Sequence, residues 1–214
     1  MTSSTIRLHD YWRSSAAYRV RIALNLKDIA YQAVPVNLLT AEHRGEAYRA
    51  LDPQGLVPAL EIDGAVLIQS LAIIDYLDRR FPDPALLPAD PVARARAMSM
   101  ALVVACDIHP VNNLRMMRWL EQELHVDKPE RDRWTAHWMT QGFAALEALA
   151  GDAPFLAGDA PGLPDLCLVP QIYNARRFEV PLEAYPKLVA IDARCAGIAA
   201  FADAHPDRIG HPDA

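Results

Sequence analysis

The first part of the chain switches between two kinds of hydrophobic periodicity. Residues 5–9 alternate polar and apolar side chains, which predicts a half-buried strand, whereas residues 16–27 repeat apolar side chains at helical spacing after a pair of serines. The same criteria assign four further elements: a strand over 31–36, a helix over 43–50, a hairpin over 56–68 with an Asp63-Gly64 turn, and a helix over 71–81. The predicted order is βαβαββα.

A proline-rich segment separates this part of the chain from the rest. Residues 81–91 contain four prolines, a density that neither a helix nor a central strand tolerates. Beyond this segment, apolar residues recur at helical spacing over 92–126 (with a kink expected at Pro110), 130–150, 164–178 and 187–204. We therefore predict an α/β domain over residues 1–84 and an all-helical domain over residues 85–214.

Composition and charge narrow the classes of function. The chain has 214 residues, of which 52% are hydrophobic and 22% charged, as expected for a folded protein with a sizeable core. No apolar run approaches the roughly 18 residues of a membrane span, and the N-terminus lacks a signal-peptide pattern, so we expect a cytoplasmic protein without a membrane partner. The net charge of −6 argues against a nucleic-acid partner.

The cysteines and the common motifs exclude several chemistries. Cys106, Cys167 and Cys195 form no C-x-x-C pair and have no metal-ligand spacing, which predicts buried structural thiols and no metal site. The glycine-rich nucleotide motifs and the zinc-protease and serine-hydrolase motifs are absent from the sequence. Any sulfur chemistry must therefore use a thiol that the protein borrows from a ligand.

Three short segments offer hydrogen-bonding groups to an anionic or peptide-like ligand. Ser14 with Ser15, and Gln69 with Ser70, stand where helices begin and expose backbone N–H groups. Pro58 interrupts an apolar strand pattern, which predicts a strand edge or a cis turn and leaves the backbone of the preceding valine to a ligand. Taken singly, each segment is also explained by helix capping or turn formation.

Together these segments resemble the cytosolic glutathione transferases, and most fully their zeta class. The resemblance extends from about residue 6 to about residue 205 and is carried by residues 14–24, 56–60, 69–74 and 165–171. It implies the fold of that family, in which an N-terminal thioredoxin-like domain binds glutathione and an all-helical domain contributes the site for the electrophile. It also implies a homodimer.

The resemblance implies which residues hold glutathione. Val57, next to a cis Pro58, would bond the cysteinyl backbone of glutathione, and Gln69 and Ser70 would hold its γ-glutamyl end. Gln54 belongs to the same binding set.

Ser14 or Ser15 would bond the glutathione sulfur. A helix N-terminus and hydroxyl donors favour the anion of a thiol whose free pKa is about 8.5. The chain departs from the zeta pattern at Ala16, where these enzymes often have cysteine, and at Gly162, where related transferases carry a serine or threonine cap. We expect the first change to tune the site, because the attacking sulfur is that of glutathione, and the second to leave the helix intact.

Several cationic and polar residues are candidates for the electrophile site. They are Arg13, His109, Asn112, Arg115, Arg176 and Arg177. The spacing of three between His109, Asn112 and Arg115 predicts one slowly turning helical face, and arginine can grip a carboxylate through two bonds. We expect the arginines to bind a dicarboxylate, and Arg13 and His109 to join the serines in catalysis.

The expected activity is glutathione-dependent cis–trans isomerisation of a maleyl keto acid, maleylacetoacetate. The thiolate would add to the cis double bond, the resulting single bond would rotate, and elimination would give the fumaryl isomer. Maleylpyruvate is an alternative substrate; general glutathione transfer and a non-catalytic glutathione-binding module are alternative functions. A glutaredoxin-like reductase is disfavoured, because residues 14–17 lack the C-x-x-C that it would need.

Overall fold

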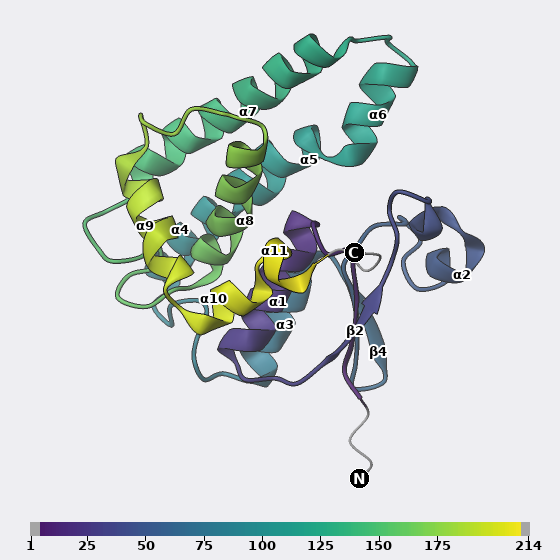
Figure 1. Cartoon of the computed structure of the whole chain (residues 1–214). Coiled ribbons are helices and arrows are strands. Elements are labelled where there is room, and N and C mark those ends of the chain that lie inside the picture. Colours follow the sequence, from purple (N-terminus) through teal and green to yellow (C-terminus); the bar gives the residue numbers. More distant parts are fainter. Residues whose placement is uncertain (1–4, 211–214) are drawn as a thin grey trace. The chain divides into compact units, whose positions relative to one another are not determined.

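The computed structural model describes residues 5–210 (Figure 1). These residues form two units, 5–85 together with 197–210, and 86–196. The first unit thus takes in a C-terminal segment that the sequence placed in the helical domain. Residues 197–210 join it because Tyr18, Arg21 and Asn25 donate hydrogen bonds to carbonyl oxygens of that segment.

The first unit is built on a four-stranded mixed sheet in the order β2-β1-β3-β4. Strands β1 and β2 are parallel, and β3 is antiparallel to both β1 and β4. Its elements are β1 (Arg7–Asp10), α1 (Ser15–Leu26), β2 (Gln32–Pro35), a 3-10 turn (Glu42–Arg44), α2 (Glu46–Arg49), β3 (Ala59–Ile62), β4 (Ala65–Ile68), α3 (Ser70–Arg80), α10 (Ala199–Ala204) and α11 (Pro206–Ile209). The βαβαββα order is confirmed, although the helix predicted over 43–50 is divided at Gly45.

Packing within the first unit follows the predicted apolar faces. Helix α1 packs against both α3 and α10, and Figure 1 shows α10 lying along α1. The side chains that fill this core are fully or almost fully buried, among them Leu8, Ile22, Leu60, Ile73 and Leu77. Helices α3 and α10 thus fix the orientation of α1 against the sheet.

The strand register brings three loops to one end of the sheet. His9, near the end of β1, pairs with Ala59, the first residue of β3, and Ala59 pairs in turn with Ile68, the last residue of β4. The segments that leave β1, enter β3 and leave β4 therefore adjoin one another. These segments carry Ser14 and Ser15, Val57 and Pro58, and Gln69 and Ser70.

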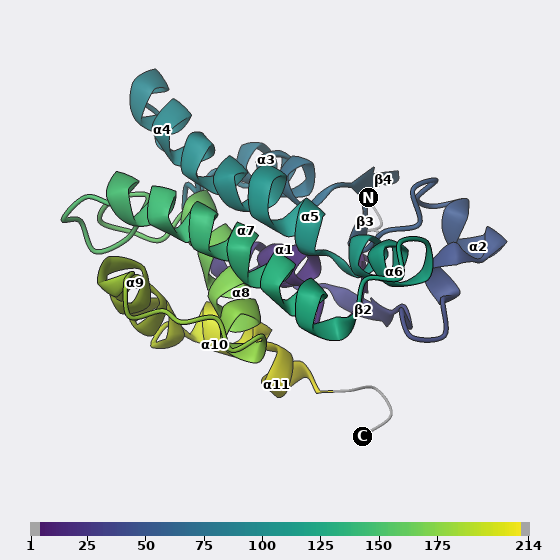
Figure 2. The ribbon, with the colours of Figure 1, turned by 90° about the horizontal axis from the view of Figure 1, so that it is seen from above.

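The second unit is helical, as predicted. Its elements are α4 (Pro91–Leu102), a π-helical segment (Val103–Ile108), α5 (His109–Asn112), α6 (Leu114–Gln122), α7 (Lys128–Leu149), α8 (Leu163–Arg177) and α9 (Pro186–Ala196). Helix α4 packs against α8, and the long α7 packs against α9 and the π-helical segment. Figure 2 shows α7 with α4 and α5 on one side of it and α9 on the other. Within residues 5–210, no helix combines the length and apolar character that crossing a membrane requires.

Two predicted helices were wrong in their continuity. The run 92–126 is divided into α4, the π-helical segment, α5 and α6, and the run 187–204 is divided into α9 and α10. Pro110 lies in the first turn of α5, immediately after the π-helical segment, and the kink expected there stays a prediction. The helical run ends at Asn113, whose extended backbone (φ −77°, ψ 164°) and capping side chain start α6.

The glycine at the start of α8 is required by close packing. A Cβ at Gly162 would lie 2.6 Å from the carbonyl oxygen of Leu86 and 2.7 Å from the Cβ of Ala157. The departure from the usual serine or threonine cap therefore has a local cause: the neighbouring backbone occupies the space that a capping side chain needs.

We predict that Gly162→Ser destabilises the protein, even though serine is normally a good helix cap. The expected decrease in the free energy of unfolding is about 1–3 kcal/mol, as for other overpacked sites, and urea denaturation would measure it. Gly151→Ser is the matched control, because no atom lies within 4 Å of a Cβ at Gly151. Wild-type or higher stability of Gly162→Ser would contradict the steric explanation.

Candidate active site

Ser14 caps α1 and keeps a hydroxyl proton to donate. Its backbone is extended (φ −70°, ψ 119°), and its Oγ accepts the backbone N–H of Ala17 at 3.2 Å. A serine hydroxyl both accepts and donates, so the cap leaves the O–H available to a ligand. Ser15 is the buried first residue of the helix, and the first turn of α1 contains no acidic residue that would oppose an anion there.

The loop before β3 presents the backbone of Val57. The Val57–Pro58 peptide is cis, as the resemblance implied. No hydrogen bond between described residues uses the backbone N–H or carbonyl of Val57. These groups stand next to β3 at the site end of the sheet, and they could pair with an extended peptide-like ligand.

Two side chains brace this loop, and the sequence analysis missed both. The buried carboxylate of Asp52 accepts the backbone N–H groups of Gln54 (2.8 Å) and Leu56 (3.2 Å). The hydroxyl of Tyr48 donates to the carbonyl oxygen of Leu56 (2.7 Å). Burial and the nearby Asp52 raise the pKa of Tyr48, so this hydroxyl stays protonated. The Asp-Pro dipeptide at residues 52–53 is a turn signal that could have indicated the first brace.

Gln69 adopts a backbone conformation that is unfavourable for its residue type. Its φ of +70° lies in the left-handed region, which costs of order 1 kcal/mol or more in a residue other than glycine. Its side chain Nε2 lies 2.6 Å from Oε1 of Gln54, to which it donates. Both glutamines are exposed at the site end of the sheet, and their place in one glutathione-binding set stays a prediction.

Arg19 is a buried cation with one hydrogen-bond partner, Ser70, among the described residues. It is 2% exposed, and its Nη1 donates to Oγ of Ser70, the buried first residue of α3, at 3.3 Å. Its Nε and Nη2 have no hydrogen-bond partner among the described residues, and no described carboxylate pairs with it. A buried charge without a counter-ion is strongly unfavourable, so an anion bound at Ser70 would stabilise the site. Sequence reasoning did not assign Arg19 a role.

The polar candidates of the second unit do not share one helical face. His109 and Asn112 belong to α5, whereas Arg115 lies in α6 beyond the break at Asn113, and this corrects the expectation of a single turning face. Both side-chain amide atoms of Asn112 are buried without a hydrogen-bond partner among the described residues. Arg115 is exposed and His109 is half-buried.

The remaining arginines differ in their surroundings. Arg176 forms an ion pair with the buried Asp192 of α9 (2.7 Å), which compensates its charge locally. Arg177 is exposed, and its guanidinium lies 4.6 Å from the ring centroid of Phe178. In the first unit, the guanidinium of Arg13 lies over the neighbouring indole ring of Trp12. The joint binding of a dicarboxylate by Arg13, Arg115 and Arg176 or Arg177 stays a prediction.

None of the cysteines belongs to the unit that holds the serine pair. Cys167 and Cys195 are buried, as expected, and burial raises the pKa of the Cys195 thiol. Cys106 is exposed, which corrects the expectation that all three would be buried; the buried residues of its π-helical segment are Val104 and Ile108.

Comparisons with known proteins agree with this geometry. Residues 8–85 match the family model "Glutathione S-transferase, N-terminal domain". The chain is 50% identical to the maleylacetoacetate isomerase of Pseudomonas aeruginosa over 94% of this chain and 96% of that protein. Among solved structures, it is similar to a holo maleyl pyruvate isomerase, a bacterial zeta-class glutathione S-transferase (TM-score 0.93, 44% identity, 97% and 99% coverage). It is also similar to the maleylacetoacetate isomerase of Methylobacterium extorquens AM1 with bound malonate and glutathione (TM-score 0.92, 38% identity, 97% and 99% coverage).

Proposed function

The chain belongs to the zeta class of the glutathione S-transferase family, and we propose on this basis that it isomerises maleylacetoacetate to its fumaryl isomer with glutathione as cofactor. The observation that carries the proposal is the end of the sheet. There the serine pair at the start of α1, the backbone of Val57 and the Arg19–Ser70 contact adjoin one another. The sequence of the chain is also 50% identical to that of such an isomerase. The dicarboxylate substrate, a homodimer and a cytoplasmic location are parts of the same proposal.

The residues at this end of the sheet fit the parts of glutathione. The backbone of Val57 would pair with its peptide groups, and Gln69, Ser70 and the buried charge of Arg19 would hold its γ-glutamyl carboxylate. Ser14 or Ser15 would then donate to the sulfur at the positive end of α1.

The chemistry divides between the bound cofactor and the side chains of this protein. Bound glutathione would supply the thiolate that adds reversibly to the cis double bond, so that the bond can rotate before the thiol is eliminated. The serine donors would lower the pKa of that thiol by bonding its anion. The arginines would neutralise the carboxylates of the substrate, and Arg13 and His109 would stabilise the negative charge that develops on its carbonyl oxygen.

One assay compares the candidate functions directly. The purified chain would be mixed with maleylacetoacetate or maleylpyruvate, with and without glutathione, and the loss of the cis-enone absorbance would be followed. We expect turnover of maleylacetoacetate that depends strictly on glutathione. Equal turnover without glutathione would exclude the mechanism. Faster turnover of maleylpyruvate would support that substrate, which is favoured by the similarity to the holo maleyl pyruvate isomerase structure.

The same preparation separates the remaining alternatives. Conjugation of aryl halides without isomerisation would indicate a general transferase. Binding of glutathione without turnover of any of these compounds would indicate a non-catalytic module.

We predict that Arg19→Met raises KM for glutathione about tenfold while changing kcat little. The variant removes the buried charge that would face the γ-glutamyl carboxylate, and a charge-assisted hydrogen bond contributes roughly 1.5–3 kcal/mol. Steady-state kinetics at varied glutathione concentrations would measure the change. Without glutathione, the variant should unfold at the same or a higher urea concentration, because it lacks an unpaired buried cation. An unchanged KM, or a loss of stability alone, would show that Arg19 is only structural.

A further inference from the structure

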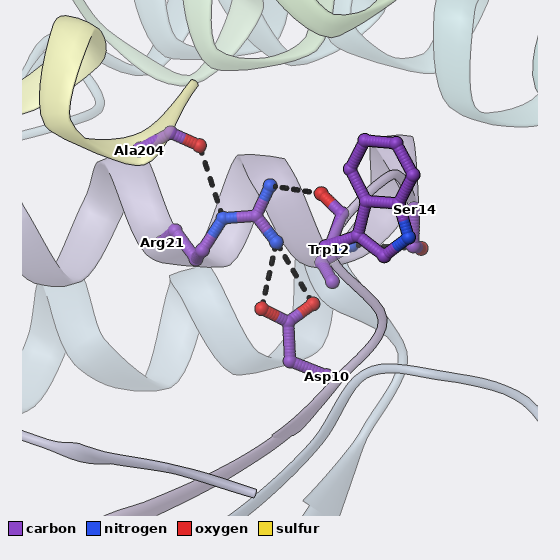
Figure 3. A network of polar contacts seen from close by, with 6 residues as sticks. Asp10, Trp12, Ser14, Arg21 and Ala204 are labelled. Atoms are coloured by element: carbon purple, nitrogen blue, oxygen red, sulfur yellow. Dashed lines mark hydrogen bonds and ion pairs between the residues drawn. The ribbon is translucent and has the colours of Figure 1, made fainter. Parts of the chain in front are cut away.

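The side chain of Arg21 joins three segments of the first unit. Its guanidinium donates from Nη1 to both carboxylate oxygens of Asp10 (2.8 and 2.7 Å), from Nη2 to the carbonyl oxygen of Trp12 (2.9 Å) and from Nε to the carbonyl oxygen of Ala204 (3.0 Å). Figure 3 shows this network, with Ser14 close to Trp12 at the start of α1. Arg21 is 1% exposed, so these bonds form away from water, where they are electrostatically stronger.

The bond to Trp12 reaches the turn that places Ser14. The backbone N–H of Ser14 donates to the carbonyl oxygen of Tyr11 (2.8 Å), so residues 11–14 form a single turn. Arg21 holds the middle of this turn to α1, and the Ser14 Oγ–Ala17 bond holds its end to the same helix. With both points attached, the turn cannot shift as a body along α1, and the hydroxyl of Ser14 is fixed.

The bond to Ala204 links this turn to the C-terminal segment. Tyr18, Arg21 and Asn25 are spaced three and four residues apart, so they lie on one face of α1. They donate to the carbonyl oxygens of Phe201, Ala204 and Ala200, respectively. Arg21 also donates to the turn before Ser14.

We propose that Arg21 is a positioning residue of the active site, which holds the hydroxyl of Ser14, one of the two candidate donors to the glutathione sulfur, in place and couples it to the docking of α10 on α1. This inference rests on the proposed function for its catalytic consequence. Both carboxylate oxygens of Asp10 accept hydrogen bonds from Arg21 and compensate the charge of its guanidinium. Arg21 therefore acts on the sulfur through the geometry of the turn and not through its own charge. A displaced Ser14 donor would bond the thiolate less well, and the bound thiol would then ionise at higher pH.

Arg21→Lys tests the proposal, because lysine keeps a cation for Asp10 but cannot bond three acceptors in the planar fork of a guanidinium. In the protein without glutathione, we expect amide hydrogen exchange at residues 11–15 to become about tenfold faster. With glutathione, the pKa of the bound thiol, followed by thiolate absorbance, should rise by about one unit. On the acidic side of the pH profile kcat should fall about tenfold, whereas KM for glutathione should change less than about twofold, because the contacts at Val57 and Ser70 remain.

Asn25→Ala is the matched control. It removes one bond between α1 and α10, to the carbonyl oxygen of Ala200, but it leaves the turn untouched. It should alter stability without altering the thiol pKa or exchange at residues 11–15. The proposal is overturned if Arg21→Lys has a wild-type thiol pKa and wild-type exchange, or if Asn25→Ala changes both equally. If the wild-type protein binds no glutathione, the proposed function fails, while the exchange measurement still decides whether Arg21 holds the turn.

Discussion

Replacing both Ser14 and Ser15 by alanine should lower kcat/KM for isomerisation about 100- to 1,000-fold, the range found when a donor to a developing negative charge is removed. The serines stand at the start of α1, where the sulfur of glutathione would lie, and the Ser14 hydroxyl has a proton to donate. Without them, the pKa of the bound thiol should return toward about 8.5, and the acidic limb of the pH profile should shift upward with it. Steady-state kinetics over a pH series would measure both effects.

Loss of the helix cap must be separated from loss of the donor in this experiment. Removing the Ser14 cap should itself decrease the free energy of unfolding by about 1 kcal/mol. Asp90→Ala provides the control, because Asp90 caps α4 in the same way by accepting the backbone N–H of Ala93 (2.8 Å). It should lose similar stability and keep its activity. The single serine variants would show which hydroxyl bonds the sulfur, and full activity of the double variant would refute the assignment.

The local elements of the first unit were predictable because each depends on its own residues. The change from a period of two to a period of 3.6 marks β1 and α1, and the Asp63-Gly64 turn marks the hairpin. The break at Asn113 was not predicted, because apolar residues continue at helical spacing on both sides of it. Only the backbone of Asn113 and its capping bonds show that one helix ends and another begins there.

The residues of the candidate site that belong to a sequence motif were predictable, and the others were not. Ser14, Val57 and Gln69 stand beside strand or helix ends that the sequence marks, and the sheet register then brings these ends together. Arg19 and Arg21 could not be assigned roles in this way, because each has a partner that is distant in sequence. Ser70 is 51 residues from Arg19, and Ala204 is 183 residues from Arg21.

At the start of α8, the carboxylate of Asp165 accepts three backbone N–H groups. These come from Leu156 (2.8 Å), Ala157 (3.3 Å) and Gly162 (2.9 Å), and Asp165 is fully buried. Asp165→Ala would leave these donors unpaired, each at about 1–3 kcal/mol, so we expect a decrease in the free energy of unfolding of at least about 3 kcal/mol in urea denaturation.

Glu130→Ala is the matched control for this loss. Glu130 is an exposed acid at the third position of α7, after a proline at the second, as Asp165 is in α8. Without buried partners, it should contribute only the few tenths of a kcal/mol of an acid near a helix N-terminus. A loss of less than about 1 kcal/mol in Asp165→Ala, or equal losses in the two variants, would show that the buried bonds do not stabilise the fold.

The stabilisation from Asp165 should also depend on pH in a defined direction. Burial raises the pKa of this carboxyl from 3.8 to about 6, because desolvation outweighs the backbone hydrogen bonds that favour its anion. The folded protein therefore holds a proton there that the unfolded chain releases, so the proton-linked part of the stability is complete below about pH 4 and is lost as the pH rises to about 6. Two pKa units correspond to about 3 kcal/mol.

Asp165→Asn, which cannot titrate, should lack this decline. The difference in unfolding free energy between wild type and variant should therefore shrink by about 3 kcal/mol between about pH 4 and about pH 7. A constant difference over that range would mean that the carboxyl titrates normally in the fold.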